Sequence, residues 1–510
     1  ATTMERRKYR DEANELVASW IIRHPLDEVE TRFAEMGVAG AAVRSADQIV
    51  GDQHVEARGS LADMTSPGGH RFQSPAALPR LDRTPGWACQ TAPALGQHTA
   101  RIRDIIATLR NRRPPQPTPV RDASGNGGPL EGFRVIDLSQ VLAGPFSAGL
   151  LGDLGAEVIM VELPDGTEER SRFGGGPGLG FLATNRNKMS ITLDVRTPEG
   201  KAALLDLVKL SDVLVENFRP GTLERWGVGP EDLHRINPGL VIMRISGFGQ
   251  IGPYSGRSSY NPVACAFGGV TYLGGWPDRT PLRDGVTAGD YVSALFGALG
   301  TLEALVRRDL DRQGQVVDVA MYESALRMTG DTIALKTGLG IRQERAGGAW
   351  PAYPISITCT ASDGNYVAIS AQTWAEVAII TARLGLSAAA TEAGARAGLQ
   401  QYVGARSRSD AVTALSKSGA WCSPVNSAAD LLEDEHAWAR GNLVRIVDES
   451  LGTLSAPGVV PSFARKPGSV ARWSASKGSD NAAVFGGLLG YSPEQIASLK
   501  RPALPAAEPD

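Results

Sequence analysis

The acidic residue with the clearest catalytic potential in this sequence is Asp290, because it opens a run of small and apolar residues. Residues 289–300 read GDYVSALFGALG, and the run ends at the basic pair Arg307 and Arg308. Such a run, closed by basic residues, predicts a buried helix. An acid at the start of a helix can cap it through a side-chain oxygen. A carboxylate at the edge of an apolar pocket can instead be a nucleophile that forms covalent acyl intermediates.

Two polar segments at the ends of expected strands could bind phosphate groups. Residues 217–221, with the sequence NFRPG, follow one strand and precede a helical stretch that contains Arg225. Backbone amides and an arginine in such a turn can hold phosphates, although a plain Pro-Gly turn with a solvated arginine explains the pattern equally well. Residues 185–188, with the sequence NRNK, precede another strand and are more typical of a basic turn. Tyr260, taken alone, is more typical of a core residue than of a site.

The elements that would position these residues alternate between strands and helices. We expect strands at residues 133–138, 157–162, 190–193, 212–216 and 240–246, and helices at residues 146–154 and 198–210. This alternation predicts an α/β fold with a doubly wound parallel sheet, whose ligands bind beyond the carboxyl ends of the strands. The turn after the first strand contains Ala143-Gly144-Pro145 rather than GxGxxG, so it does not predict a dinucleotide.

The remainder of the chain has a different character. Strands expected at residues 315–320 and 364–370 and a helix at 375–384 predict a smaller α+β domain. Residues 8–35 have apolar positions at helical spacing, interrupted at Pro25 and Leu26. We therefore divide the chain into a sheet domain at residues 130–330, which carries Asp290, a smaller domain at 331–450 and a returning segment at 451–510. Residues 113–129, rich in Pro, Gly and polar residues, are expected to be a linker.

An internal repeat accounts for residues 1–112. The motif Val-x-Ser-Ala, then Asp-x-His, then Ala-Arg-Gly occurs at residues 43–59 and again at residues 425–441, with an offset of 382 residues throughout. Matches that include His and Gly at unchanged spacing indicate duplicated units rather than a short solenoid repeat. Residues 1–112 are thus expected to be the carboxyl-terminal part of one unit, followed by a linker and one complete unit.

Composition excludes several classes of function. The 510 residues are 42% apolar and 21% charged, with a formal net charge of -3, which gives no basic field for nucleic acid. No apolar run is long enough to cross a membrane. The four cysteines are far apart without a CxxC pair, and the six histidines show no ligand spacing, so we expect no metal site and a reducing, cytoplasmic location.

Together these motifs resemble the class III coenzyme A transferases, a family that includes α-methylacyl-CoA racemases and carnitine CoA-transferase-like enzymes. The resemblance starts at Gly132–Ser139, covers residues 130–510, and runs through the segments 154–162, 187–188, 215–221, 289–290 and 314–319. It implies an acyl-CoA:carboxylate CoA-transferase in which Asp290 forms an aspartyl anhydride and then an aspartyl-CoA thioester. CoA is then a carrier, with no tightly bound cofactor, and the substrates are an acyl-CoA and a carboxylate. Family members form interlocked homodimers, so we expect such a dimer or a partner chain that supplies the missing half unit.

The resemblance also implies a set of CoA-binding residues. Leu142 and Ala143 would line the pantetheine or adenine path, and Ser258, Ser259 and Tyr260 would flank the thiol end near Asp290. The nucleotide end and the phosphates would be held by Asn185, Asn187, Lys188, Asn217, Phe218, Arg219 and Arg225. Many relatives place a basic residue where this chain has Leu163, so we expect Arg170 or Arg172 to replace that contact.

The acyl group and the reaction branch are less constrained. The oxalate-related branch of the family has a glycine run, of which this chain has only Gly347-Gly348, so oxalate or formate is not expected as a substrate. Three aromatic residues, Trp350, Tyr353 and Trp374, favour a medium or large organic acid instead. A racemase would need an acid/base pair of His and Asp. Racemases of the family carry that His where this chain has Tyr260, and no histidine lies between His234 and His436. A third possibility is a non-catalytic CoA-binding subunit, with residues 1–110, which have no counterpart of Asp290, acting as a scaffold.

Overall fold

The computed structural model describes residues 8–86, 91–109, 127–164, 170, 178–349, 352–387, 391–448 and 452–499. They form two compact units, one from Ala1–Val270, Gly285–Arg342 and Val444–Asp510 and the other from Thr271–Asp284 and Gln343–Leu443. The expected linker lies outside the described residues except for residues 127–129. Within the described ranges, no helix has the length and apolar character needed to cross a membrane.

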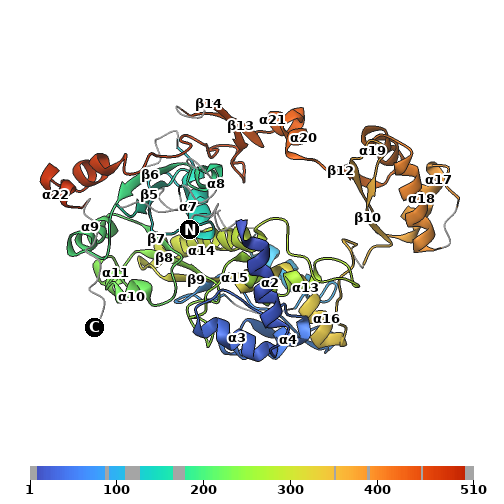
Figure 1. Cartoon of the computed structure of the whole chain (residues 1–510), viewed down its shortest axis with the longest axis horizontal. Coiled ribbons are helices and arrows are strands. Elements are labelled where there is room, and N and C mark those ends of the chain that lie inside the picture. Colours follow the sequence, from blue (N-terminus) through green and yellow to red (C-terminus); the bar gives the residue numbers. More distant parts are fainter. Residues whose placement is uncertain are drawn as a thin grey trace. The chain divides into compact units, whose positions relative to one another are not determined.

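The first unit is built on a seven-stranded sheet (Figure 1). In spatial order the strands are β3 (Arg80–Leu81), β9 (Val316–Ala320), β8 (Val241–Ser246), β7 (Val213–Glu216), β4 (Arg134–Asp137), β5 (Glu157–Glu162) and β6 (Lys188–Thr192). Only the short β3 is antiparallel to its neighbour, and the other strands pair in parallel. The predicted α/β class with a parallel sheet is therefore confirmed.

The order of the strands places a crevice at the centre of this sheet. The chain enters at β4, continues outward through β5 and β6, and then returns to the other side of β4 with β7, β8 and β9. At such a reversal the connections leave in opposite directions, so a crevice opens beyond the carboxyl ends of the two central strands. Here these strands are β4 and β7, and the segments that follow them begin at Leu138 and Asn217.

Apolar side chains cover both faces of the sheet. Val241, Met243 and Ile245 of β8 face helices α7 (Ala143–Asp153) and α14 (Ala288–Asp311). The alternate residue Ile242 joins the opposite core, which contains α9 (Pro198–Lys209) and α11 (Pro230–Ile236). Each fully buried Val, Leu or Ile stabilises the fold by about 1.5–3 kcal/mol. The expected strands and the helices at 146–154 and 198–210 agree with these elements within a few residues.

Helix α14 lies unusually close to the sheet because two of its residues are glycines. A Cβ atom at Gly297 would lie 2.6 Å from the sulfur of Met243, and one at Gly300 would lie 2.3 Å from Pro79. Neither distance is possible for carbon atoms in contact. The glycines in the apolar run therefore set the position of the helix, and with it the position of Asp290 in its first turn.

The N-terminal segment packs into this same unit, where Figure 1 shows its blue elements beside α15 and α16. Its elements are α2 (Arg10–Ile21), α3 (Leu26–Glu35), α4 (Ala46–Val50), α5 (Gln53–Arg58), β1 (Leu61–Thr65), β2 (Arg71–Pro75), β3 and α6 (Thr99–Leu109). Arg58 donates to Asp318 at 2.8 Å and to Glu323 at 3.0 Å, and β3 extends the main sheet. Residues 8–86 are thus an integral part of the sheet unit.

The second unit is smaller and has an antiparallel sheet. Its strands β10 (Ile355–Thr360), β11 (Tyr366–Ala371) and β12 (Trp421–Pro424) share a core with α17 (Trp374–Arg383), α18 (Glu392–Gly404) and α19 (Arg408–Ser418). The unit also contains α20 (Ala428–Glu433) and α21 (Glu435–Ala439). The remaining elements are α8 (Leu179–Thr184), α10 (Thr222–Arg225), α12 (Asn261–Phe267), α13 (Val270–Leu273), α15 (Met321–Met328), α16 (Thr332–Leu339), β13 (Leu443–Asp448), β14 (Gly452–Pro457), the π-helix η1 (Ala482–Leu488) and α22 (Pro493–Ser498).

Buried His54 makes the stability of the first unit sensitive to acid. Its Nε2 lies 2.9 Å from the carbonyl oxygen of Phe248, and its Nδ1 accepts from the backbone N–H of Tyr254 at 3.1 Å. Both bonds require a neutral ring with the proton on Nε2. Burial lowers the pKa of His54 from its ordinary value of 6.5, with Arg58 acting in the same direction and Asp52 and Glu323 opposing it.

We therefore expect the free energy of unfolding to fall as the pH drops below about 6.5. In this range His54 is protonated in the unfolded chain but stays neutral in the folded chain, because its pKa is lower there. Urea denaturation at pH 7.5, 6.5 and 5.5 measures this slope. His54→Gln should reduce the slope, whereas His436→Gln, at the exposed repeat position, should leave it unchanged. An equal slope in wild type and His54→Gln would show that other groups control the acid response.

Candidate active site

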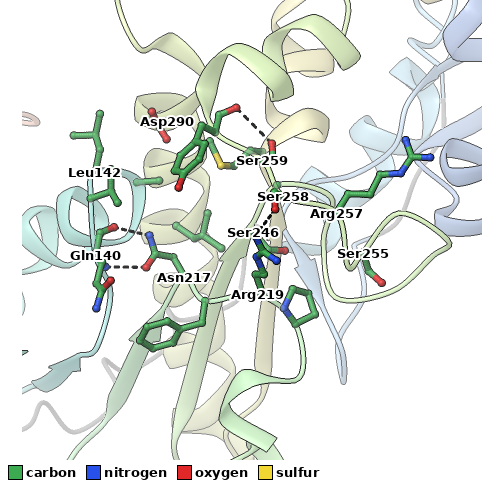
Figure 2. Close-up of a pocket in the computed structure, with 18 residues that line it drawn as sticks. Gln140, Leu142, Asn217, Arg219, Ser246, Ser255, Arg257, Ser258, Ser259 and Asp290 are labelled. Atoms are coloured by element: carbon green, nitrogen blue, oxygen red, sulfur yellow. Dashed lines mark hydrogen bonds between the residues drawn. The ribbon is translucent and has the colours of Figure 1, made fainter. Parts of the chain in front are cut away.

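A cavity of about 230 Å³ lies at the expected crevice, beyond the carboxyl ends of β4, β7 and β8 (Figure 2). It is lined by Gln140, Val141, Leu142, Ala143, Asn217, Phe218, Arg219, Pro220, Ile245, Ser246, Gly247, Ser255, Arg257, Ser258, Ser259, Tyr260, Asp290 and Met321. Nine of the thirteen residues predicted for the site are among them. The fold therefore gathers, from four separate segments, side chains that the family resemblance implied for the site.

Asp290 belongs to the first turn of α14 and does not occupy its N-cap position. The helix starts at Ala288 after the N-cap position Thr287, and the side chain of Asn261 accepts the backbone N–H of Gly289 at 2.7 Å. The half-buried carboxylate of Asp290 lines the cavity. The N-cap position therefore belongs to Thr287, and the carboxylate of Asp290 lies in the first turn, where the helix dipole favours negative charge.

The neighbouring Tyr291 anchors the start of α14 against α7. Its ring meets that of Phe146 edge-on, with centroids 4.9 Å apart. Such a pair contributes about 0.5–1.5 kcal/mol beyond the area it buries. The contact holds Asp290 close to the start of α7, where Leu142 and Ala143 line the same cavity.

The loop after β4 is held by reciprocal hydrogen bonds to the end of β7. The backbone N–H of Gln140 donates to Asn217 Oδ1 at 2.8 Å, and Asn217 Nδ2 donates to the Gln140 carbonyl at 2.6 Å. Between Gln140 and Leu142, Val141 has a φ of 70°. This conformation costs a β-branched residue on the order of 1–3 kcal/mol and is typical of functional loops. Asn217 thus positions the loop that faces Asp290.

Positive charge lies away from Asp290, as Figure 2 shows for Arg219 and Arg257. Arg219 donates to the hydroxyl of Ser258, and Ser258 donates in turn to the carbonyl oxygen of Gly37 at 2.9 Å. The loop after α3, in the N-terminal segment, therefore takes part in holding the arginine. Arg257 stacks on the ring of Tyr254 at 3.6 Å. This end of the cavity suits an anionic group such as a phosphate or a carboxylate.

We expect Ser258→Ala to weaken acyl-CoA binding, because Arg219 then loses the hydroxyl that links it to Gly37. KM for the acyl-CoA should rise about 3–10-fold, equivalent to one hydrogen bond of about 1 kcal/mol, with little change in kcat. Steady-state kinetics measure this. Ser255→Ala, which removes another hydroxyl from the same cavity wall, is the matched control and should leave KM nearly unchanged. Equal effects of both variants would contradict a specific role for Ser258.

Four predicted CoA-binding residues lie outside this cavity. Lys188 is 1% exposed, and its Nζ donates to Asp137, Pro145 and Asn185 at 2.7, 2.7 and 2.8 Å. Burial lowers the pKa of Lys188. Asn187 donates to Asp153, and Arg225 donates to Thr222. In this conformation all three N–H donors of Lys188 are used within the protein. Contact with CoA stays a prediction for these four residues, Asn185, Asn187, Lys188 and Arg225.

A second cavity of about 200 Å³ adjoins the first and shares Gln140 and Phe218 with it. Leu163 and Trp226 contribute apolar surface to it. Arg170, one of the two expected substitutes for a basic residue at Leu163, is held by Glu162 with both distances 2.7 Å. Arg172 and Trp350 lie outside the described residues, and Tyr353 and Trp374 belong to the second unit.

Sequence reasoning missed several lining residues, most importantly Gln140, Val141, Ser255 and Arg257. Gln140 and Val141 lie directly beyond the first strand, so the rule for ligand positions on such sheets could have included them. Ser255 and Arg257 lie in an irregular loop without periodicity. No local signal marks them. Within the described ranges, none of the residues that line the cavity is a histidine, and no cluster of His, Cys, Asp and Glu suited to a metal ion was found.

Comparison with known proteins identifies the family to which the chain belongs. The sequence pattern of CoA-transferase family III matches residues 1–99 and 130–481. The chain belongs to this family. It is therefore a class III CoA-transferase, as the resemblance implied.

Relatives and a solved structure support the same assignment. The succinyl-CoA–L-malate CoA-transferase alpha subunit of Chloroflexus aurantiacus is 38% identical over 393 residues, which cover 73% of this chain and 91% of the relative. The beta subunit of the same name is 37% identical and is covered to 97%. The crystal structure of a CaiB/BaiF family protein from Brucella suis superimposes with a TM-score of 0.64 at 30% identity, covering 71% of this chain and 100% of that one.

Proposed function

We propose that this family III CoA-transferase moves CoA from an acyl-CoA to a free carboxylate through covalent intermediates on Asp290. The observation that carries the proposal is the position of the Asp290 carboxylate, which lines the cavity at the crevice of the sheet. A carboxylate nucleophile suits this reaction because an acyl anhydride and a thioester both retain the energy of the donor thioester. Racemisation is less well supported, since the cavity lining includes Tyr260, where the family resemblance implies the racemase histidine, and no histidine among its described residues.

The proposed cycle has two symmetrical halves. The Asp290 carboxylate attacks the donor carbonyl, the C–S bond breaks, and CoA thiolate leaves an aspartyl–acyl anhydride. The thiolate then attacks the aspartyl carbonyl and releases the donor acid, leaving an aspartyl-CoA thioester. The acceptor carboxylate attacks this thioester to form a second anhydride and thiolate. Attack of the thiolate on the acceptor carbonyl gives the new acyl-CoA and restores Asp290. No proton needs to be transferred, in keeping with a cavity lining that has no histidine among its described residues.

The surroundings of Asp290 suit these intermediates. Leu142, Ile245 and Met321 line the cavity and reduce access of water, which would hydrolyse an anhydride. Ser259 and Tyr260 border the same space. In this proposal they contact the thiol end of CoA. Arg219 and Arg257 supply positive charge for the phosphates of CoA or for the distal carboxylate of a diacid. The apolar second cavity, with Trp226 and Leu163, is a suitable site for the adenine end.

The names of the relatives suggest the substrates. Two relatives that match over most of their length are named for transfer from succinyl-CoA to L-malate. Succinate, which is the acid of the donor, and L-malate are both small dicarboxylic acids. A cavity of about 230 Å³ with two arginines suits a short carbon chain with a distal carboxylate. We therefore propose succinyl-CoA as the donor and L-malate or a similar C4–C5 dicarboxylate as the acceptor.

Oxygen labelling tests both the reaction and its route. The enzyme is incubated with succinyl-CoA and L-malate labelled with ¹⁸O in its carboxylates, and the products are analysed by mass spectrometry. The anhydride route leaves one acceptor oxygen on Asp290, and a later turnover releases it in succinate. Labelled succinate together with malyl-CoA supports the proposal. Malyl-CoA without label in succinate contradicts the covalent route, and no transfer to any of a panel of C2–C8 acids contradicts the function.

A further inference from the structure

The 382-residue repeat extends to the structure of both copies. Helices α3, α4 and α5 of the N-terminal segment start 382 residues before α19, α20 and α21, and β1 starts 382 residues before β13. Ser45 and Ser427 occupy the same N-cap position with a capping box. Asp52 and Asp434 accept the same two backbone N–H groups at the next helix. Residues 43–61 and 425–443 are thus two copies of one local structure.

The first copy is inserted into the sheet unit. The ring of His54 is enclosed by Phe248, Tyr254, Phe267 and Tyr322, with centroids 5.0–6.3 Å away. At the end of α5, Arg58 reaches the two carboxylates of Asp318 and Glu323. Ile49 is 2% exposed in the same core. We call this receiving surface, formed by Phe248, Tyr254, Phe267, Asp318, Tyr322 and Glu323, the dock.

The second copy has the same histidine and arginine at matching positions, but no surface like the dock covers them. Its His436 and Arg440 correspond to His54 and Arg58 and are exposed to solvent. Leu431, which corresponds to Ile49, is 44% exposed, and Leu432 beside it is 47% exposed. The first copy therefore buries a histidine, an arginine and an apolar residue, and the second copy exposes the matching residues to solvent. Exposed apolar residues grouped in this way mark an interaction surface.

We propose that residues 425–443 dock onto a second CoA-transferase family III sheet unit, distinct from the one in this chain. The dock at residues 248–323 is already filled by residues 43–61, so neither this unit nor that of an identical copy can accept them. The receiving unit must offer an aromatic cage with a backbone carbonyl for His436, and two carboxylates equivalent to Asp318 of β9 and Glu323 of α15 for Arg440. The relatives named alpha and beta subunits show that distinct chains occur under one enzyme name in this family.

This proposal rests on family membership and on the repeat, not on the reaction at Asp290. A failure of CoA transfer and a failure of docking are therefore distinguishable. The docking also gives residues 43–61 and 425–443 equivalent roles, each completing a sheet unit at the same place. Just before residues 43–61, Gly37 in the loop after α3 accepts from Ser258 at the cavity, and Gly419 is its counterpart just before residues 425–443. The chain that leads into a docked segment therefore also contributes to the binding site of the receiving unit.

Photo-crosslinking at matched positions tests the proposal. Gln53 is exposed at the rim of the dock and donates to the hydroxyl of Tyr254 at 3.0 Å, and Glu435 is its exposed counterpart. The photo-crosslinker p-benzoylphenylalanine replaces either residue in the full chain. The protein is expressed in the organism that naturally produces it, and the intact cells are irradiated. The probe at position 53 should crosslink to residues 249–258 of its own unit. The probe at position 435 should crosslink to the equivalent loop of a family III unit with a different sequence.

The Arg440→Ala variant adds a control within the second copy. It should lower the yield of the crosslink from position 435 at least about 10-fold and leave the crosslink from position 53 unchanged. Crosslinks from position 435 to residues 249–258 of this chain, to a protein without a family III unit, or to nothing while position 53 reacts, would each overturn the proposal.

Discussion

Asp290→Asn should abolish CoA transfer, with kcat reduced at least about 1000-fold. The amide keeps the size of the side chain and its place in the first turn of α14 but is too weak a nucleophile to attack a thioester. Binding of CoA should persist, because Arg219 and the loops after β4 and β7 are untouched. Rapid-quench incubation with succinyl-CoA, followed by hydroxylamine, should give an Asp290 hydroxamate in wild type and none in the variant.

Glu303→Gln is the matched control for this experiment, since Glu303 is an exposed carboxylate on the same helix and outside the cavity. It should transfer CoA at nearly the wild-type rate. Transfer by Asp290→Asn within 10-fold of wild type would exclude Asp290 as the nucleophile. Hydroxamate at another carboxylate would relocate the covalent step.

The fold of the sheet unit was largely predictable from sequence, because its signals are local. Strands such as β5 and β8 are short, mostly apolar runs. Helix α9 begins at Thr197-Pro198, where threonine caps the helix and proline occupies its first turn. The turn sequences after β4 and β7 were also recognisable. Their meeting in one crevice followed from the rule for the ends of parallel strands, which is topological and needs no side-chain detail.

The parts that were not predictable depend on contacts between distant segments. Lys188 follows a polar turn and resembles a phosphate ligand in sequence, yet its neighbours in space are Asp137 and Pro145 of another strand and helix. The support of Arg219 by Gly37 involves a backbone carbonyl, which has no sequence signature. The N-terminal segment was recognised as a repeat, but its insertion into the sheet unit of the same chain required the structure.

Arg58→Ala should destabilise the first unit by about 3–5 kcal/mol, which is the usual effect of removing one member of a buried ion pair. Arg58 is 2% exposed and bridges Asp318 and Glu323. Burial alone would raise the pKa of Glu323, but Arg58 and Arg80 outweigh it and the net pKa is lowered. Without Arg58, two carboxylates remain in the dock with only Arg80 and Ser60 on Glu323. Urea denaturation of the full chain measures the change.

The repeat supplies the control that separates position from residue type. Arg440→Ala removes the same side chain from the same local structure, but Arg440 is exposed, so the free energy of unfolding of the isolated chain should change by less than about 0.5 kcal/mol. Arg58→Lys should lie between the two, because an ammonium group cannot reach both carboxylates as the guanidinium does. Because Glu323 has a lowered pKa, its stabilising effect is complete at neutral pH and disappears as the pH falls through that value. The difference between wild type and Arg58→Ala should therefore shrink as the pH falls below 4.5, the ordinary pKa of glutamate. Equal losses in Arg58→Ala and Arg440→Ala would show that the docked copy contributes no more than the free one.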